Sequence, residues 1–213
     1  MTVALRPMGR GDLAAVLTLE RALFGVEAWT EGMLSAELAA VPGGRYYLVA
    51  EDESLVVGYA GLLAVRGGQA DVLTMAVAED RWGQGIGAAL LGELLAEAAR
   101  RGCREVFLEV RVDNPRAQNL YRKHGFTEIG LRRGYYQPSG TDALVMRRAA
   151  PGATGPGVDR GGLMARGRRG RRRASAQNAP AQNASAQNAP AQSAPAQSAP
   201  AQNAPARNAG GTG

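Results

Sequence analysis

Three residue types that often carry function are almost absent from this chain of 213 residues, which has one cysteine, Cys103, one histidine, His124, and one lysine, Lys123. A single cysteine excludes an internal disulfide framework. No cluster of His, Cys and Asp has metal-ligand spacing, so we expect no metal site. We interpret Cys103 as a small residue near a helix end and His124 as a structural residue at the end of another helix.

Long hydrophobic runs are also missing. No stretch of about 18 consecutive apolar residues occurs, which is the minimum for a transmembrane helix. The N-terminal residues MTVALRPMGRGDL lack the apolar core of a signal peptide. We therefore expect a cytoplasmic protein with no transmembrane helix and no membrane partner.

The net charge of +6 is unevenly distributed along the chain. Residues 1–150 hold 17 Lys+Arg and 18 Asp+Glu, whereas residues 151–213 hold eight Arg and one Asp. The basic character therefore belongs to the second segment and indicates no nucleic-acid surface on the first. Residues 1–150 have the mixed composition of a globular domain, and residues 151–213 have almost nothing that forms a core. We predict one domain followed by a disordered tail.

The tail contains two low-complexity segments. Residues 176–210 repeat a five-residue unit of the AQNAP type, and residues 165–173 read ARGRRGRRR, with six arginines. Proline in every fifth position prevents a regular helix. The arginine cluster has two interpretations: a weak, salt-sensitive contact with RNA or the ribosome, or a solvated extension without a partner.

Hydrophobic periodicity in residues 1–150 predicts an alternation of strands and helices. We expect Thr30 and Asn114 to cap helices and Asp12 to cap the first helix, with Trp29 packed on Leu34 as a hydrophobic staple. Gly102 is expected to end the helix after the glycine-rich stretch. The pattern indicates an α+β (mixed α/β) domain on one sheet. The expected strands are 2–7, 45–51, 55–65, 70–77, 105–110, 126–133 and 141–148, and the helices 13–24, 31–39, about 86–101 and 115–124.

The stretch RWGQGIGAALL, residues 81–91, places three glycines in five positions directly before an apolar helix. A glycine-rich turn between a strand and a helix N-terminus offers free N–H groups and positive potential, which together favour phosphate. No Lys-Ser or Lys-Thr follows, so this is not a nucleoside triphosphate P-loop. Three expected antiparallel strands precede the turn, which is not the context of a dinucleotide-binding fingerprint.

Four stretches of the chain resemble the GCN5-related N-acetyltransferase (GNAT) superfamily, and within it the bacterial enzymes that acetylate an N-terminal alanine of a ribosomal protein. They are MAVAEDRWGQGIGAALL (75–91), LEVRVDNPRAQNLYRKHGF (108–126), RRGYYQ (132–137) and the N-terminal LRPM…DLAAVLTLERALF…AWT. The resemblance covers residues 3 to about 148. It implies the GNAT fold: a single mixed sheet of about seven strands with four helices, splayed between strands 4 and 5.

The resemblance implies that acetyl-CoA is the cosubstrate. Main-chain N–H groups of the loop would hold its pyrophosphate, the strand before the loop its pantetheine arm, and the cap residue of the later helix a further part. The family has Gln or Arg where Trp82 stands, so either Arg81 supplies the cation or the phosphate relies on backbone groups alone. The cofactor-binding residues so implied are Met75, Ala76, Val77, Trp82, Gly83, Gln84, Gly85, Ile86, Gly87 and Asn114.

Two residues are candidates for proton transfer. Glu109 lies between Leu108 and Val110, and apolar surroundings raise the pKa of a carboxyl, which suits a general base. The alternative is a strand-edge carboxylate paired with a neighbouring arginine, Arg111 or Arg104. Tyr121 lies two helical turns after Asn114 and is either a core residue or the general acid that protonates the CoA sulfur. The resemblance favours Glu109 as the base, acting through water, and Tyr121 as the acid.

The same resemblance suggests where a peptide substrate lies. Glu27 and Trp29 belong to the connection after the first helix, where Glu27 would meet a basic second residue of the peptide. Tyr135 and Tyr136 belong to the last hairpin and would clamp the peptide backbone, or they pack at the rim. The expected partner is a protein N-terminus, that of a small-subunit ribosomal protein in particular. Two other functions stay open: acetylation of a lysine or a small amine, and a non-catalytic acetyl-CoA-binding adaptor.

Overall fold

A computed structural model describes residues 3–149. The predicted tail, with its arginine cluster at 165–173 and its repeats at 176–210, lies outside the described residues. The strands are β1 (Ala4–Pro7), β2 (Arg45–Asp52), β3 (Leu55–Ala64), β4 (Gln69–Val77), β5 (Glu105–Arg111), β6 (Thr127–Tyr136) and β7 (Thr141–Ala149), and the helices are α1 (Leu13–Phe24), α2 (Glu31–Ala39), α3 (Ile86–Arg100) and α4 (Pro115–Lys123).

The seven strands form one mixed sheet in the order β1-β2-β3-β4-β5-β7-β6. Strands β1 to β4 are an antiparallel meander, and β7 pairs antiparallel with both β5 and β6. Only β4 and β5 run parallel, because α3 carries the chain back across the sheet between them. The predicted fold class, the number of strands and helices and the antiparallel meander are confirmed.

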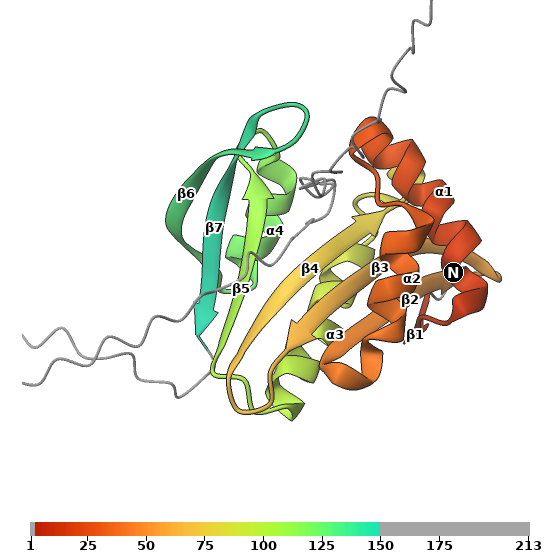
Figure 1. Ribbon diagram of the computed structural model, residues 1–213, viewed down its shortest axis with the longest axis horizontal. Helices are drawn as coiled ribbons and strands as arrows, with labels where there is room; N and C mark the ends of the chain where they lie inside the picture. Colours follow the sequence, from red (N-terminus) through yellow and green to blue (C-terminus); the bar gives the residue numbers. More distant parts are fainter. Residues whose placement is uncertain (1–2, 150–213) are drawn as a thin grey trace, which may run out of the picture.

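The sheet opens between β4 and β5. These two strands pair only where Gln69–Asp71 meets Glu105–Phe107, although β4 continues to Val77 and β5 to Arg111. Figure 1 shows the two strands close at one end and diverging toward the other. The splay predicted from the resemblance is therefore present, and it divides the sheet into β1–β4 and β5-β7-β6.

Two hydrophobic cores lie on opposite faces of the sheet. One includes Leu90 and Leu94 of α3 and Tyr121 of α4, and the other includes Val16 of α1 and Leu34 of α2. Figure 1 shows α1 and α2 on one face of β2 and β3, with α3 behind them. Within residues 3–149, none of the helices has the length and apolarity that a membrane span requires.

The local capping predictions are confirmed at two of three positions. The Thr30 hydroxyl accepts a hydrogen bond from the Met33 N–H, and the Asn114 amide oxygen accepts one from the Ala117 N–H at 3.0 Å. The prediction for Asp12 is wrong: its carboxylate makes no cap bond to α1, because it is held instead by the Gly9 N–H and by Arg6.

The last hairpin differs from the prediction in its turn. We expected a connection of residues 134–140, but β6 continues through Tyr136 and pairs it with Thr141. Two register shifts in β6, at Glu128/Gly130 and Arg132/Tyr136, accommodate the extra residues. Bulges of this kind leave no clear alternation in the sequence, so the length of the strand was underestimated.

A buried carboxyl group joins α1 to the sheet and to the connection before α2. Glu20 is fully buried and accepts hydrogen bonds from the Trp29 N–H at 2.7 Å and from the Tyr59 hydroxyl. The Tyr59 hydroxyl also lies 2.9 Å from the Thr74 hydroxyl of β4. Burial raises the pKa of Glu20 to about 7, although the two hydrogen bonds oppose the shift. Hydrophobic periodicity does not predict this network. Glu20 lies among the apolar positions of α1, but its partners belong to other elements.

The raised pKa makes the stability of the fold depend on pH. The folded-state pKa of Glu20 lies above the usual value of 4.5, so its contribution to the free energy of unfolding is fully present below about pH 4.5 and declines as the pH rises to about 7. The whole decline corresponds to about 3 kcal/mol. Relative to Glu20→Gln, which cannot titrate, wild-type protein should lose about this much stability over that range.

Urea unfolding at several pH values between 4.5 and 8 measures the difference. The exposed Glu31 of α2 provides the control, since Glu31→Gln should follow the wild type throughout. A constant difference between wild type and Glu20→Gln across this range contradicts the prediction.

Candidate active site

The glycine-rich turn after β4 requires glycine at two of its three positions. Gly83 has φ +79° and Gly85 φ +85°, a region that side chains with a Cβ rarely adopt. Gly85 is the N-cap of α3, and the first intrahelical bond runs from the Ala89 N–H to its carbonyl at 3.0 Å. The N–H groups of Ile86, Gly87 and Ala88 therefore have no partner inside the helix and face its N-terminal end. This arrangement fits a phosphate group.

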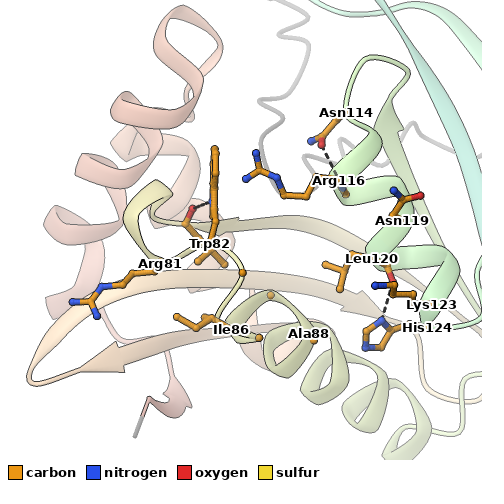
Figure 2. Close-up of a pocket in the computed structure, with 15 residues that line it drawn as sticks. Arg81, Trp82, Ile86, Ala88, Asn114, Arg116, Asn119, Leu120, Lys123 and His124 are labelled. Carbon is orange, nitrogen blue, oxygen red and sulfur yellow. Dashed lines mark hydrogen bonds between the residues drawn. The ribbon is translucent and has the colours of Figure 1, made fainter. Parts of the chain in front are cut away.

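Trp82 and Arg81 do not place a cation on this turn. The Trp82 Nε1–H donates to the Val77 carbonyl at 2.8 Å, which ties the turn to the end of β4. The Arg81 guanidinium donates to the buried Asp52 at 2.7 Å, and Figure 2 shows its side chain directed away from the turn. Of the two options left open by the sequence, Arg81 is therefore the weaker one, because its charge is already neutralised.

A cavity of about 510 Å³ lies between the N-terminal end of α3 and one side of α4. Its walls include most of the predicted cofactor residues and several that were not predicted. No Asp or Glu occurs among the described residues that line it. The lining residues are Val77, Arg81, Trp82, Gly83, Gly85, Ile86, Gly87, Ala88, Asn114, Arg116, Ala117, Asn119, Leu120, Lys123 and His124. Within residues 3–149 no group of three or more His, Cys, Asp or Glu is arranged to hold a metal ion.

The end of β4 exposes main-chain groups toward the splay. The Ala78 N–H donates to the Val57 carbonyl of β3 at 2.9 Å, and Val77 pairs with Gly58 in the next position. Because hydrogen-bonded and non-hydrogen-bonded pairs alternate in an antiparallel ladder, the main-chain groups of Val77 and Met75 face away from β3. Those of Ala76 face β3. The register therefore favours Met75 and Val77 over Ala76 for main-chain contact with a ligand in the splay.

Two other predicted cofactor residues, Gln84 and Asn114, have side chains that bond to the protein backbone. The Gln84 side chain folds back and donates to the Asp80 carbonyl at 3.3 Å, so only its backbone faces the turn. Asn114 caps α4 and also lines the cavity, so both expected roles are compatible. The roles of all these residues in binding stay predictions.

Glu109 lies on the face of β5 opposite the cavity. Val106, Leu108 and Val110 belong to the core beneath α3 and α4, and strand alternation places Glu109 on the other face. Its carboxylate is buried and forms an ion pair with Arg132 of β6 at 3.1 Å. The sequence suggested Arg111 or Arg104 as the partner and did not point to Arg132. The Arg132 guanidinium brings a positive charge from β6 to this carboxylate. The raised pKa expected from burial stays a prediction.

Two buried tyrosines from different elements lie near each other, and one of them, Tyr136, also lies near Glu109. Tyr121 of α4 is fully buried and packs edge-on against Phe126, with ring centroids 5.8 Å apart. Tyr136 of β6 is also fully buried, and burial, with Tyr135 and Glu109 nearby, raises the pKa of Tyr136 well above its usual value. The Tyr136 hydroxyl has no hydrogen-bond partner among the described residues. A neutral phenol at this position can donate a hydrogen bond to a ligand.

The predicted peptide-contact residues lie on the Glu109 face. Glu27, at the end of a 3₁₀ turn after α1, forms an ion pair with Arg111 of β5 at 3.1 Å. Tyr135 and Tyr136 pack edge to face with centroids 5.0 Å apart, and the Arg111 guanidinium lies 5.5 Å from the Tyr136 ring. Trp29 is buried in the core below α1, apart from this group. A basic peptide residue would therefore share Glu27 with Arg111.

Two arginines that the sequence gave no reason to select form part of the site. Arg132 is the partner of Glu109, and the Arg116 guanidinium of α4 lies over the Trp82 ring, 3.4 Å from its centroid. Such a stack contributes about 0.5–1 kcal/mol at an exposed position. Both contacts join residues from different elements, so no local sequence spacing predicts them. Both arginines lie in stretches quoted for the resemblance, Arg116 in 108–126 and Arg132 in 132–137, but neither was given a role there.

Comparisons with known proteins agree with this geometry. The model of the acetyltransferase (GNAT) family matches residues 13–126. N-alpha-acetyltransferase RimI of Mycobacterium tuberculosis is 40% identical over 150 residues, which cover 68% of this chain and 92% of that protein. The chain belongs to the GNAT family, and it is an acetyl-CoA-dependent N-acetyltransferase.

Two solved structures share the fold. The ribosomal-protein-S18-alanine N-acetyltransferase of Escherichia coli superposes with a TM-score of 0.62 at 27% identity, over 72% of this chain and 98% of that chain. A phosphinothricin acetyltransferase of Sinorhizobium meliloti, solved in complex with AcCoA, has the same TM-score of 0.62 and 27% identity, over 72% of this chain and 91% of that chain. The fold is therefore shared by enzymes with different acceptors.

The two kinds of glycine in the turn should respond differently to alanine. Gly85→Ala forces a side chain into φ +85° and should lower the free energy of unfolding by about 1–2 kcal/mol. Gly87→Ala is the matched control. It lies in the first turn of α3, where a Cβ meets Leu120 Cδ2 at an ordinary 3.5 Å, and it should gain helix propensity. Urea unfolding of the ligand-free proteins measures both. Equal effects of the two substitutions contradict this account of the turn.

Proposed function

We propose that this enzyme acetylates the α-amine of a protein N-terminus that begins with alanine, that of a small-subunit ribosomal protein in particular. One observation carries the proposal. The buried carboxylate of Glu109 lies on the face of β5 opposite the glycine-rich turn and near Tyr136, which packs on Tyr135. Arg111 of the same strand face pairs with Glu27. A peptide N-terminus on that face reaches the splay between β4 and β5 from the side opposite the turn. The relative in Mycobacterium tuberculosis, named as an N-alpha-acetyltransferase, supports the same acceptor.

The reaction makes three demands that the residues of the site can meet. Acetyl-CoA supplies the acetyl thioester. Glu109 accepts, through a water molecule, the proton that the ammonium group of the peptide must lose before its nitrogen can attack. The Val77 N–H faces the splay, where it donates to the carbonyl oxygen as that atom gains negative charge. The amine nitrogen bonds to the carbonyl carbon, and the Tyr121 hydroxyl gives its proton to the sulfur as the carbon–sulfur bond breaks. The second proton of the nitrogen then returns to the Tyr121 oxygen, which restores the phenol.

The face of the sheet that carries Glu109 offers both a carboxylate and a hydroxyl group, which suits a peptide with a basic second residue. Glu27 presents a carboxylate whose present partner, Arg111, is also bonded to Asp113. Arg111 can therefore remain paired when Glu27 turns to a cationic side chain. The Tyr136 hydroxyl, which has no partner among the described residues, supplies a donor for a peptide carbonyl. A cytoplasmic location and a weak contact of residues 165–173 with RNA or the ribosome remain predictions from the sequence.

The choice of acceptor is tested with two peptides and acetyl-CoA, followed by mass spectrometry. One peptide begins with a free Ala-Arg and contains no lysine, and the other is blocked at its N-terminus and has one internal lysine. We expect acetylation of the first peptide alone. Acetylation of the blocked peptide, or of neither peptide while a small amine such as phosphinothricin is acetylated, would replace the proposed substrate by a lysine or small-molecule acceptor.

The roles of Glu109 and Tyr121 are tested with Glu109→Gln and Tyr121→Phe. Each substitution removes one proton transfer while nearly preserving the size of the side chain, so kcat should fall about 100-fold or more. Glu105→Gln is the matched control for the first, since Glu105 lies on the same face of β5 and pairs with Arg147 at the surface. Tyr46→Phe, on β2 and bonded to Glu93, is the control for the second. Activity within a few-fold of wild type in either site variant would reject that role.

A further inference from the structure

The glycine-rich turn has donors for a phosphate but no positively charged side chain of its own. Trp82 stands where the family has Gln or Arg, and its only N–H is already bonded to the Val77 carbonyl at 2.8 Å. The adjacent Arg81 is held by the buried Asp52. A pyrophosphate carries at least two negative charges, and the partial charge of a helix N-terminus balances only part of that. The turn alone therefore does not balance the negative charge of a pyrophosphate, and a positive charge has to come from another element.

Arg116, in the first turn of α4, contacts this turn through the side chain of Trp82. Its guanidinium stacks on the face of Trp82, with Cζ 3.4 Å from the ring centroid. Figure 2 shows the side chain reaching from α4 across the cavity toward the indole. A stacked guanidinium keeps its N–H donors in the plane of the group, where they remain able to bind an anion. Among the described residues Arg116 forms no ion pair with a carboxylate.

The lysine and the histidine that line the cavity are less suited to the turn. Lys123 and His124 lie at the far end of α4 in Figure 2, and the His124 ring is bonded to the Leu120 carbonyl at 2.8 Å. Since no Asp or Glu occurs in the described lining, nothing there competes with a phosphate for Arg116. The indole of Trp82 holds the guanidinium at the cavity, whose walls also include Gly83, Gly85 and the start of α3.

We propose that Arg116, held on the face of Trp82, binds the pyrophosphate of CoA and replaces the cation that the turn lacks. The positive charge thus comes from α4, 34 residues after the turn position that carries it in the family's usual pattern. Trp82 serves as the platform that orients it. This inference rests on the use of acetyl-CoA by the enzyme, and it concerns only which side chain contacts the phosphates.

Calorimetric titration of the full-length protein with CoA and with dephospho-CoA tests the proposal without an activity assay. Both ligands contain the pyrophosphate, but only CoA has the 3′-phosphate. Arg116→Gln should weaken the binding of both by the same factor, about 10-fold or more, since a charge-assisted hydrogen bond is lost. Arg122→Gln is the matched control, because Arg122 lies on the same helix, pairs with Glu128 and does not line the cavity.

A second substitution tests the replacement itself. In the Arg116→Gln background, Trp82→Arg returns a cation to the turn and should recover most of the lost affinity. Unchanged CoA affinity in Arg116→Gln, a loss confined to CoA and absent with dephospho-CoA, or no recovery in the double variant would each overturn the inference. In the first two cases the wild-type protein still binds CoA and the proposed function stands. Absence of CoA binding by the wild-type protein would overturn both.

Discussion

The short parallel pairing between β4 and β5 determines where the sheet leaves main-chain groups open to a ligand. Three residues on each strand are paired, Gln69–Asp71 with Glu105–Phe107, and beyond them the two strands separate. Separation leaves main-chain groups of Met75 and Val77 without a neighbouring strand, and a buried strand edge of this kind is costly unless a partner satisfies it. The same separation lets a group held on the α3 side of the sheet meet a group held on the Glu109 side. One irregularity in the sheet thus leaves an unpaired strand edge between its two halves.

The two faces of the sheet carry different chemistry around this opening. On one side the N-terminal end of α3, the capped start of α4 and three cationic side chains surround a cavity without acidic residues in its described lining. On the other side the carboxylates of Glu109 and Glu27 are each matched with an arginine from another element. The charge on the first face therefore favours an anionic ligand, whereas the carboxylates on the other face are already paired within the protein.

The sequence predicted those features that depend on neighbours in the chain. Thr30 and Asn114 cap helices because their hydroxyl and amide groups reach N–H groups three residues later, and the glycines of the turn precede an apolar helix. Features that join distant segments were missed or assigned wrongly. Glu109 forms an ion pair with Arg132, which the sequence did not suggest, and Arg111 forms ion pairs with Glu27 and Asp113. Asp12 failed as a cap because Arg6 and Gly9 hold its carboxylate.

The positions of the two tryptophans have an optical consequence. Trp29 and Trp82 are the only indoles in the chain, and they lie in different electrostatic surroundings. The backbone N–H of Trp29 donates to Glu20 in the core beneath α1, whereas the face of Trp82 is covered by the Arg116 guanidinium at the cavity. Indole emission responds to nearby charge, so the intrinsic fluorescence of this protein divides into two independent signals. One follows the protonation of a buried carboxyl group, and the other follows the charge that occupies the mouth of the cavity.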